Sequence, residues 1–79
     1  MTLEEHLALD YPILILPDVD TAGRRVYFAK HPDLLGCCSH GDTPEQAIAN
    51  LRDARELWIR TAYEDGVEIP LPSTESAVA

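Results

Sequence analysis

The segment from Pro32 to Ile48 constrains the fold more than any other part of this 79-residue chain. It reads Pro-Asp-Leu-Leu-Gly-Cys-Cys-Ser-His-Gly-Asp-Thr-Pro-Glu-Gln-Ala-Ile, and its two glycines bound a short strand predicted over residues 37–40. Thr43 suits a helix N-cap and Pro44 a first helical residue, because proline lacks only an N–H that would be unpaired there. Gln46 completes a capping-box pattern, in which its side chain reaches the Thr43 backbone N–H. The segment therefore sets where a strand ends and a helix begins.

Two more strands are predicted before this segment. Continuous apolar runs favour strands over residues 11–16 and 24–30. Pro17 is expected to end the first strand, and the polar residues 17–23 to form the loop of a hairpin. The three strands together predict a three-stranded antiparallel sheet.

Helices are predicted on both sides of this sheet in the sequence. Apolar residues at helical spacing predict a long helix from Pro44 to about Asp65, with Gly66 as the residue that ends it. A capping-box pattern at the N-terminus predicts a short helix from Leu3 to about Leu9. The core-facing residues of the long helix are expected to be Ala47, Leu51, Ala54, Trp58 and Ala62, flanked by Ile48, Leu57 and Ile59.

A short fourth strand over residues 67–69 would complete a single α+β domain of order β-β-β-α-β. We divide the chain into a short N-terminal helical extension over residues 1–10, a domain over residues 11–72 and a flexible tail over residues 73–79.

The acidic composition limits the partners that the chain can bind. Six Lys and Arg against fourteen Asp and Glu give a formal charge of −8. Such a surface repels phosphate backbones, so direct nucleic-acid binding is not expected. It suits a basic protein partner, although the same charge also serves solubility alone. No apolar run reaches the ~20 residues of a membrane span, and the N-terminus is too acidic for a signal peptide, so we expect a cytoplasmic protein.

The first two strands are apolar on both faces, whereas an antiparallel sheet with one wet face alternates apolar and polar residues. One long helix covers one face, so the other needs cover from the N-terminal helix or from another chain. A domain this small also gains stability from oligomerisation. We therefore expect a homo-oligomer, a dimer or a tetramer. The interface with a second copy or another partner is expected to include Leu14, Leu16, Tyr27, Trp58 and Ile59.

The acidic residues that could carry catalysis have structural explanations. Asp18 and Asp20 fall in the predicted hairpin loop, Asp33 in a turn and Asp42 beside the helix cap. Two-metal chemistry needs carboxylates converging from rigid positions, whereas the predicted strand interiors are apolar. We therefore expect no catalytic residues, no enzyme activity and no cofactor.

The cysteine and histidine residues predict no metal site. Cys37 and Cys38 are adjacent, so they should point to opposite faces of a strand and remain free thiols, as in a reducing compartment. A zinc site of both cysteines and His40 would lack the usual spacing and a second ligand pair. His31 and His40 flank the third strand and are expected to be exposed.

Three segments together resemble the HicB family, the antitoxins of HicA–HicB type II toxin–antitoxin systems. The first is the hairpin from residues 11–18 to residues 26–29. The second, Pro-Asp-Leu-Leu-Gly-Cys over residues 32–37, is similar to the family's Pro-Asp-Leu-Pro-Gly-Cys turn, with Leu35 at the second proline position. The third, Gly-Asp-Thr-Pro-Glu-Gln-Ala over residues 41–47, is similar to its Gly-Asp-Thr-x-Glu-Glu-Ala helix start.

The resemblance implies a partial ribonuclease-H-like fold over roughly residues 11–72, in a prokaryotic cytoplasmic protein that forms dimers or higher oligomers. Members of that family neutralise a small, basic, mRNA-cleaving toxin by covering its active site. Full-length members generally carry a C-terminal DNA-binding segment, and only nine residues follow Pro70 here, so we expect no repressor role for this chain alone. The alternatives are an orphan oligomeric structural or small-ligand-binding domain and, less favoured, a metal-dependent nuclease.

Overall fold

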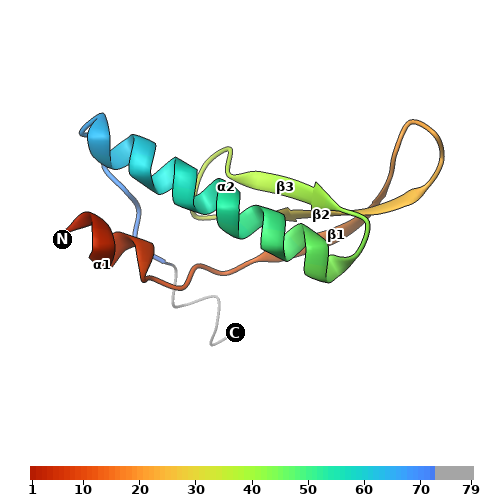
Figure 1. Cartoon of the computed structure of the whole chain (residues 1–79), viewed down its shortest axis with the longest axis horizontal. Helices are drawn as coiled ribbons and strands as arrows, with labels where there is room; N and C mark the ends of the chain where they lie inside the picture. Colours follow the sequence, from red (N-terminus) through yellow and green to blue (C-terminus); the bar gives the residue numbers. More distant parts are fainter. Residues whose placement is uncertain (73–79) are drawn as a thin grey trace.

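The computed structural model describes residues 1–72, which form two helices and three strands (Figure 1). The strands make one antiparallel sheet of order β1-β2-β3, and α2 lies across one of its faces (Figure 1). This arrangement confirms the predicted α+β sheet with a long helix and a short N-terminal helix. The tail predicted over residues 73–79 lies outside the described residues. In chain order the elements are α1 (Leu3–Leu7), β1 (Leu14–Val19), β2 (Arg25–Lys30), β3 (Cys38–Gly41) and α2 (Pro44–Glu64).

The start of α2 is held by side chains of the Pro32–Ile48 segment. Thr43 is the N-cap, and its Oγ1 accepts a hydrogen bond from the Gln46 N–H at 3.1 Å, as expected of a capping threonine. The Gln46 side chain binds one residue earlier than predicted, because its Oε1 accepts from the Asp42 N–H at 2.9 Å. Both bonds tie the end of β3 to the first turn of α2.

The end of α2 is a Schellman motif. The Gly66 N–H donates to the Tyr63 carbonyl at 3.3 Å, and the Val67 N–H donates to the Ala62 carbonyl at 2.9 Å. Gly66 has φ of +69°, a left-handed conformation that glycine adopts without a Cβ penalty. The prediction that Gly66 ends the helix is confirmed.

The first strand differs from its prediction because Pro17 lies inside β1, opposite Tyr27, and does not end the strand. The Asp20 N–H donates to the Arg24 carbonyl at 2.9 Å, and N–H directions alternate along a strand. Pro17 therefore falls at a position whose N–H would point away from β2. Since β1 is an edge strand, proline removes no ladder hydrogen bond there. The hairpin loop is consequently shorter than predicted, and Asp18 belongs to the strand.

The predicted fourth strand is not found among residues 1–72. Residues 67–70 run as irregular chain, yet Ile69 is buried and the Tyr11 hydroxyl donates to the Pro70 carbonyl at 2.7 Å. Pro70 has no N–H to give a sheet ladder. The segment is thus fixed by side-chain contacts at the α1 end of the domain.

The core lies between α2 and the sheet. The segments before β1 and after α2 add Tyr11 and Ile69 to it. It contains four of the predicted helix positions, whereas Leu57 is 68% exposed and points to solvent. Helix α1 packs against α2 and not over the sheet (Figure 1). Its core-side residues Leu3 and Leu7 contact the main cluster. The buried apolar residues are Tyr11, Ala29, Leu34, Cys37, Ala47, Leu51, Ile59, Ala62 and Ile69.

Candidate interaction surface

The two faces of the sheet have different surroundings. Neighbouring residues of a strand point to opposite faces, and Ala29, which is fully buried, marks the face under α2. The pairs Ile15–Ala29 and Pro17–Tyr27 belong to this helix face. The residues on the opposite face, called here the open face, are Leu14, Leu16, Asp18, Val26, Phe28, Lys30, Cys38 and His40.

The open face is mostly apolar and is covered by no element of residues 1–72. Leu14 and Leu16 remain 40% and 45% exposed. At its centre the Phe28 ring contacts the His40 ring edge-on, with centroids 5.0 Å apart. Since α1 packs on α2, the N-terminal helix does not provide the second cover that the sequence left open. Exposed apolar side chains gathered on one face are typical of a protein interaction site.

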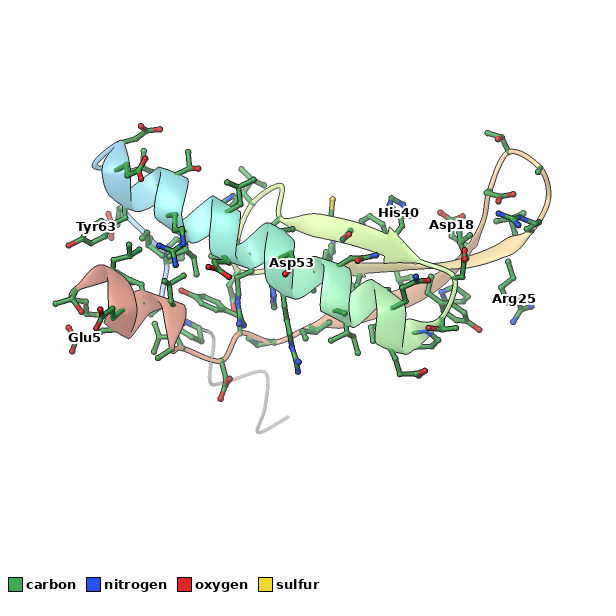
Figure 2. All side chains as sticks on the ribbon, in the orientation of Figure 1. Glu5, Asp18, Arg25, His40, Asp53 and Tyr63 are labelled. Atoms are coloured by element: carbon green, nitrogen blue, oxygen red, sulfur yellow. The ribbon has the colours of Figure 1, made fainter. Side chains whose placement is uncertain are left out.

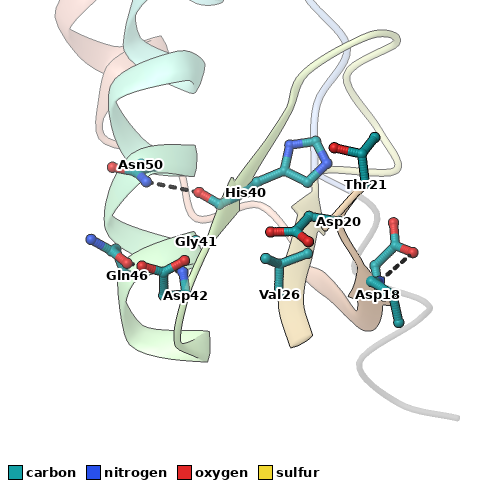
Figure 3. Close-up of a pocket in the computed structure, with 10 residues that line it drawn as sticks. Asp18, Asp20, Thr21, Val26, His40, Gly41, Asp42, Gln46 and Asn50 are labelled. Atoms are coloured by element: carbon teal, nitrogen blue, oxygen red, sulfur yellow. Dashed lines mark hydrogen bonds between the residues drawn. The ribbon is translucent and has the colours of Figure 1, made fainter. Parts of the chain in front are cut away.

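A pocket of about 580 Å³ adjoins the open face where the β1–β2 hairpin extends past β3 (Figure 3). Its walls combine open-face residues with the hairpin loop and the first turns of α2. Three carboxylates and no Lys or Arg line it, so its chemistry favours a cationic group over an anion. The lining residues are Asp18, Val19, Asp20, Thr21, Val26, His40, Gly41, Asp42, Gln46 and Asn50.

Asp20 organises the hairpin loop beside this pocket. Its Oδ1 accepts hydrogen bonds from the backbone N–H groups of Ala22 and Arg24, both at 2.9 Å. Its Oδ2 lies 3.3 Å from the Arg24 Nε. The Arg24 backbone bond is the main reason that the pKa of Asp20 lies below its ordinary value. Asp20 therefore stays ionised and acts as a structural loop residue, as the sequence suggested.

The structure separates the five residues predicted for an interface. Leu14 and Leu16 lie exposed on the open face, whereas Tyr27 lies half-buried on the helix face. Trp58 is half-buried against the core, and its Nε1–H donates to the Leu35 carbonyl at 3.0 Å. Ile59 has no exposed surface, so it cannot touch a partner directly. The five residues therefore do not form one surface.

Sequence reasoning did not assign the other open-face residues to a surface. The prediction that Pro17 ends the strand puts Asp18 in the loop, whereas the structure pairs Asp18 with Val26 in the sheet. Val26, Phe28 and Lys30 alternate with helix-face residues along β2, and this alternation is the signal that identifies them once one buried position is known. Figure 2 shows Asp18 and His40 toward the hairpin end of the sheet, away from α1.

His31 is buried, contrary to the prediction that it is exposed. It is 1% exposed, its Nδ1 lies 3.0 Å from the Pro12 carbonyl, and its ring contacts the Tyr11 ring edge-on at 5.9 Å. Burial lowers its pKa from the ordinary value, and the nearby Arg55 adds to this effect against the Pro12 carbonyl and Asp33. His31 therefore connects the start of β1 to the turn after β2 as a neutral core residue.

The adjacent cysteines are both free and differ in environment, as their positions predicted. Cys37 is buried, and burial raises the pKa of its thiol, whereas Cys38 is exposed on the open face. Among the residues that the structure describes, no three His, Cys, Asp or Glu side chains are placed to hold a metal ion. None of the described helices has the length and apolar character that crossing a membrane requires.

Comparison with known proteins places the chain in a family. The family model described as "HicB_like antitoxin of bacterial toxin-antitoxin system" matches residues 11–79. The chain belongs to the HicB-like antitoxin family. Two UPF0150 proteins of Synechocystis sp. (strain ATCC 27184 / PCC 6803 / Kazusa) are similar in size to this member. One is 32% identical over 71 residues, covering 90% of this chain and 89% of the relative. The other is 34% identical over 70 residues, covering 89% and 84%.

A third relative of this HicB-like chain is longer. It is Antitoxin HicB 1 of Photorhabdus laumondii subsp. laumondii, 36% identical over 62 residues that cover 78% of this chain and 37% of the relative. No solved structure matches the chain.

Proposed function

We propose that this HicB-like chain is a non-catalytic antitoxin module that binds and neutralises a small, basic, mRNA-cleaving toxin of the HicA type. Family membership over residues 11–79 is the observation that carries the proposal. The formal charge of −8 supports it, because an acidic surface attracts a basic partner and repels nucleic acid. The module acts in the cytoplasm, forms homo-oligomers and binds the toxin through residues 11–72, with residues 1–10 as an extension.

The described residues support a binding role more than a catalytic one. The pocket carboxylates Asp18 and Asp20 already have structural partners, because Asp18 Oδ1 accepts from the Val19 N–H at 2.8 Å and Asp20 holds the loop. His40, the pocket's titratable ring, contacts Phe28 rather than a carboxylate. A catalytic base is usually held in place by a hydrogen bond to a nucleophile or to a second polar side chain, and the bonds named here are to backbone N–H groups instead. We therefore assign the pocket and the open face to contacts with proteins.

The test is co-expression of the chain with the product of the neighbouring gene. We expect that product to be a small basic protein that stops growth and cleaves mRNA, and the HicB-like chain to co-purify with it and restore growth. A neighbour that is neither toxic nor retained by the chain would contradict the antitoxin role. Metal-dependent ribonuclease activity of the chain, lost in Asp18→Asn or Asp33→Asn, would favour the nuclease alternative instead.

A matched pair of single-charge variants tests whether charge near the pocket matters. Asp42 lines the pocket, and Asp53 lies exposed on α2 (Figure 2). We expect Asp42→Asn to weaken toxin binding more than Asp53→Asn, because close opposite charges contribute more than distant, screened ones. Equal effects of the two variants would mean that only the overall charge attracts the toxin.

A further inference from the structure

The open face carries a positive charge at one end and a negative charge at the other, and this charge pattern favours one arrangement of two copies. We propose that the open face packs on the same face of a second copy. The two copies are related by a two-fold axis that lies in the interface plane and runs perpendicular to the strands, which brings Lys30 of each copy beside Asp18 of the other. This rests on the oligomerisation included in the proposed function, to which it adds the surface and the geometry, and it requires no toxin. The apolar centre of the face, around Leu16 and Phe28, would be buried between the copies.

The sheet edges are poor alternatives for self-association. On the outer edge of β1, Pro17 has no N–H, and the Val19 N–H is bonded to its neighbour's carboxylate, Asp18 Oδ1. On the outer edge of β3, the His40 carbonyl accepts from Asn50 Nδ2 at 2.8 Å. Missing or occupied edge groups interrupt the ladder that an added strand would form and so disfavour strand addition. Association is therefore directed to the open face and away from extension of the sheet.

The residues of the open face form three rows across the strands. The middle row is Leu16, Phe28 and His40, since Leu16 pairs with Phe28 and Phe28 with His40. Lys30 lies in the row on one side, and Asp18 lies in the row on the other. The single basic residue and the single carboxylate therefore occupy opposite ends of an apolar strip.

This charge pattern decides the orientation of the second copy. A two-fold axis perpendicular to the strands reverses their direction, so it places the Lys30 end of each copy over the Asp18 end of the other. Facing sheets pack ~10 Å apart and neighbouring strands ~4.8 Å apart, distances that a lysine and an aspartate side chain reaching toward each other span together. An axis parallel to the strands would instead place Lys30 over Lys30, and like charges facing each other disfavour a complex. The face is thus self-complementary in one orientation.

A charge-swap series on the full chain tests this arrangement by analytical ultracentrifugation without toxin. We expect the unsubstituted chain to dimerise, and Lys30→Asp and Asp18→Lys each to raise the dimer dissociation constant by about tenfold, as for close charge pairs at interfaces. The combined Lys30→Asp/Asp18→Lys variant should restore dimerisation. The matched control reverses the Glu56–Arg60 pair of α2, 2.9 Å apart in one helix, and should leave the dimer unchanged.

The two cysteines provide an independent readout in the unsubstituted chain. Maleimide labelling of Cys38, on the open face, should slow as protein concentration rises, whereas buried Cys37 should label slowly at every concentration. A mass of one chain at micromolar concentration, or a combined variant no better than the single ones, would overturn the proposal. Cys38 protected at all concentrations in a monomer would show that the chain's own residues 73–79 cover the face, which also overturns it. Toxin binding by a monomer would leave the antitoxin role intact.

Discussion

The helix face and the open face belong to the same three strands but are stabilised differently. On the helix face, Ala29 is fully buried and the backbone of Gly41 approaches α2 so closely that a Cβ there would lie 2.4 Å from the Ala47 nitrogen. On the open face, Leu14 and Leu16 keep 40% and 45% of their surface exposed. Small residues bring α2 close to one side, whereas large residues are left uncovered on the other.

This difference separates two uses of apolar residues in a short chain. Burial against α2 stabilises the monomer, and its contribution does not depend on protein concentration. Burial of the open face would stabilise an assembly, and its contribution would grow with concentration by mass action. Variants on the two faces should therefore differ in kind as well as in size.

The largest effect on the free energy of unfolding is expected from truncating a buried side chain of α2. Leu51 is fully buried, so Leu51→Ala should lower the free energy of unfolding by about 2–5 kcal/mol. The matched open-face variant, Leu16→Ala, should lower it by an amount that increases with protein concentration, because it weakens the assembly. Urea unfolding followed by circular dichroism at two concentrations measures both. A loss below ~1 kcal/mol for Leu51→Ala would mean that the helix face is not the main core.

A smaller loss is expected from adding one methyl group between β3 and α2. The Cβ of Gly41→Ala would meet backbone atoms of residues 46 and 47 at 2.4–2.9 Å, which cannot rotate away. We expect a loss of about 1–3 kcal/mol in the free energy of unfolding. Cys38→Ala, in the same strand but on the open face, should change it by less than ~0.5 kcal/mol. Equal losses would show that α2 can shift to accept the methyl group.

The histidines provide a pH test of the same comparison. His31 is buried among Tyr11, Asp33 and Arg55, and burial lowers its pKa below the ordinary 6.5. The unfolded chain therefore binds a proton that the folded chain resists, so His31 should make the free energy of unfolding fall as pH drops from about 7 to 5. In His31→Gln that part of the slope should be lost, while His40→Gln on the open face should keep it. Identical slopes in all three proteins would contradict the assignment.

The sequence predicted best the features that depend on a few adjacent residues, such as the ends of a helix. Thr43 and Pro44 placed the start of α2, and Gly66 placed its end, because caps depend on a few adjacent residues. The strand end predicted at Pro17 was wrong, because proline interrupts a central strand but is accepted on an edge strand. The local sequence does not show which strand lies at the edge of the sheet. One wrong boundary then placed Asp18 in a loop.

The need for a candidate surface was predictable from the sequence, but of its residues only Leu14 and Leu16 were. Apolar runs in both strands indicated that a second face needed cover, and the structure leaves that face uncovered within residues 1–72. Which residues share it depends on register, which pairing across strands determines. Trp58 and Ile59 are ambiguous in the sequence, because large apolar residues of a helix can face either a core or a partner. The packing of α2 places Ile59 in the core and Trp58 against it.

The smallest effect is expected at Leu35, beside the open face. The Cys37 N–H donates to the Leu34 carbonyl at 3.0 Å and Gly36 has φ of +80°, so residues 34–37 form a type II turn with Leu35 at the position that favours proline. The HicB family's usual proline thus has a physical reason. Leu35→Pro should raise the free energy of unfolding by about 0.4–1 kcal/mol by restricting the unfolded chain.

Leu35→Ala controls for removing the leucine side chain, which is 90% exposed and lines a shallow pocket with the open-face residues Phe28 and Cys38. Chemical denaturation should show a gain for Leu35→Pro only, because alanine does not fix φ. A loss with proline would mean that the turn needs another backbone conformation at residue 35. If Leu35→Ala also weakens self-association, the surface covered in the assembly includes this turn as well as the strands, because the Leu35 carbonyl remains held by the Trp58 Nε1–H in that variant.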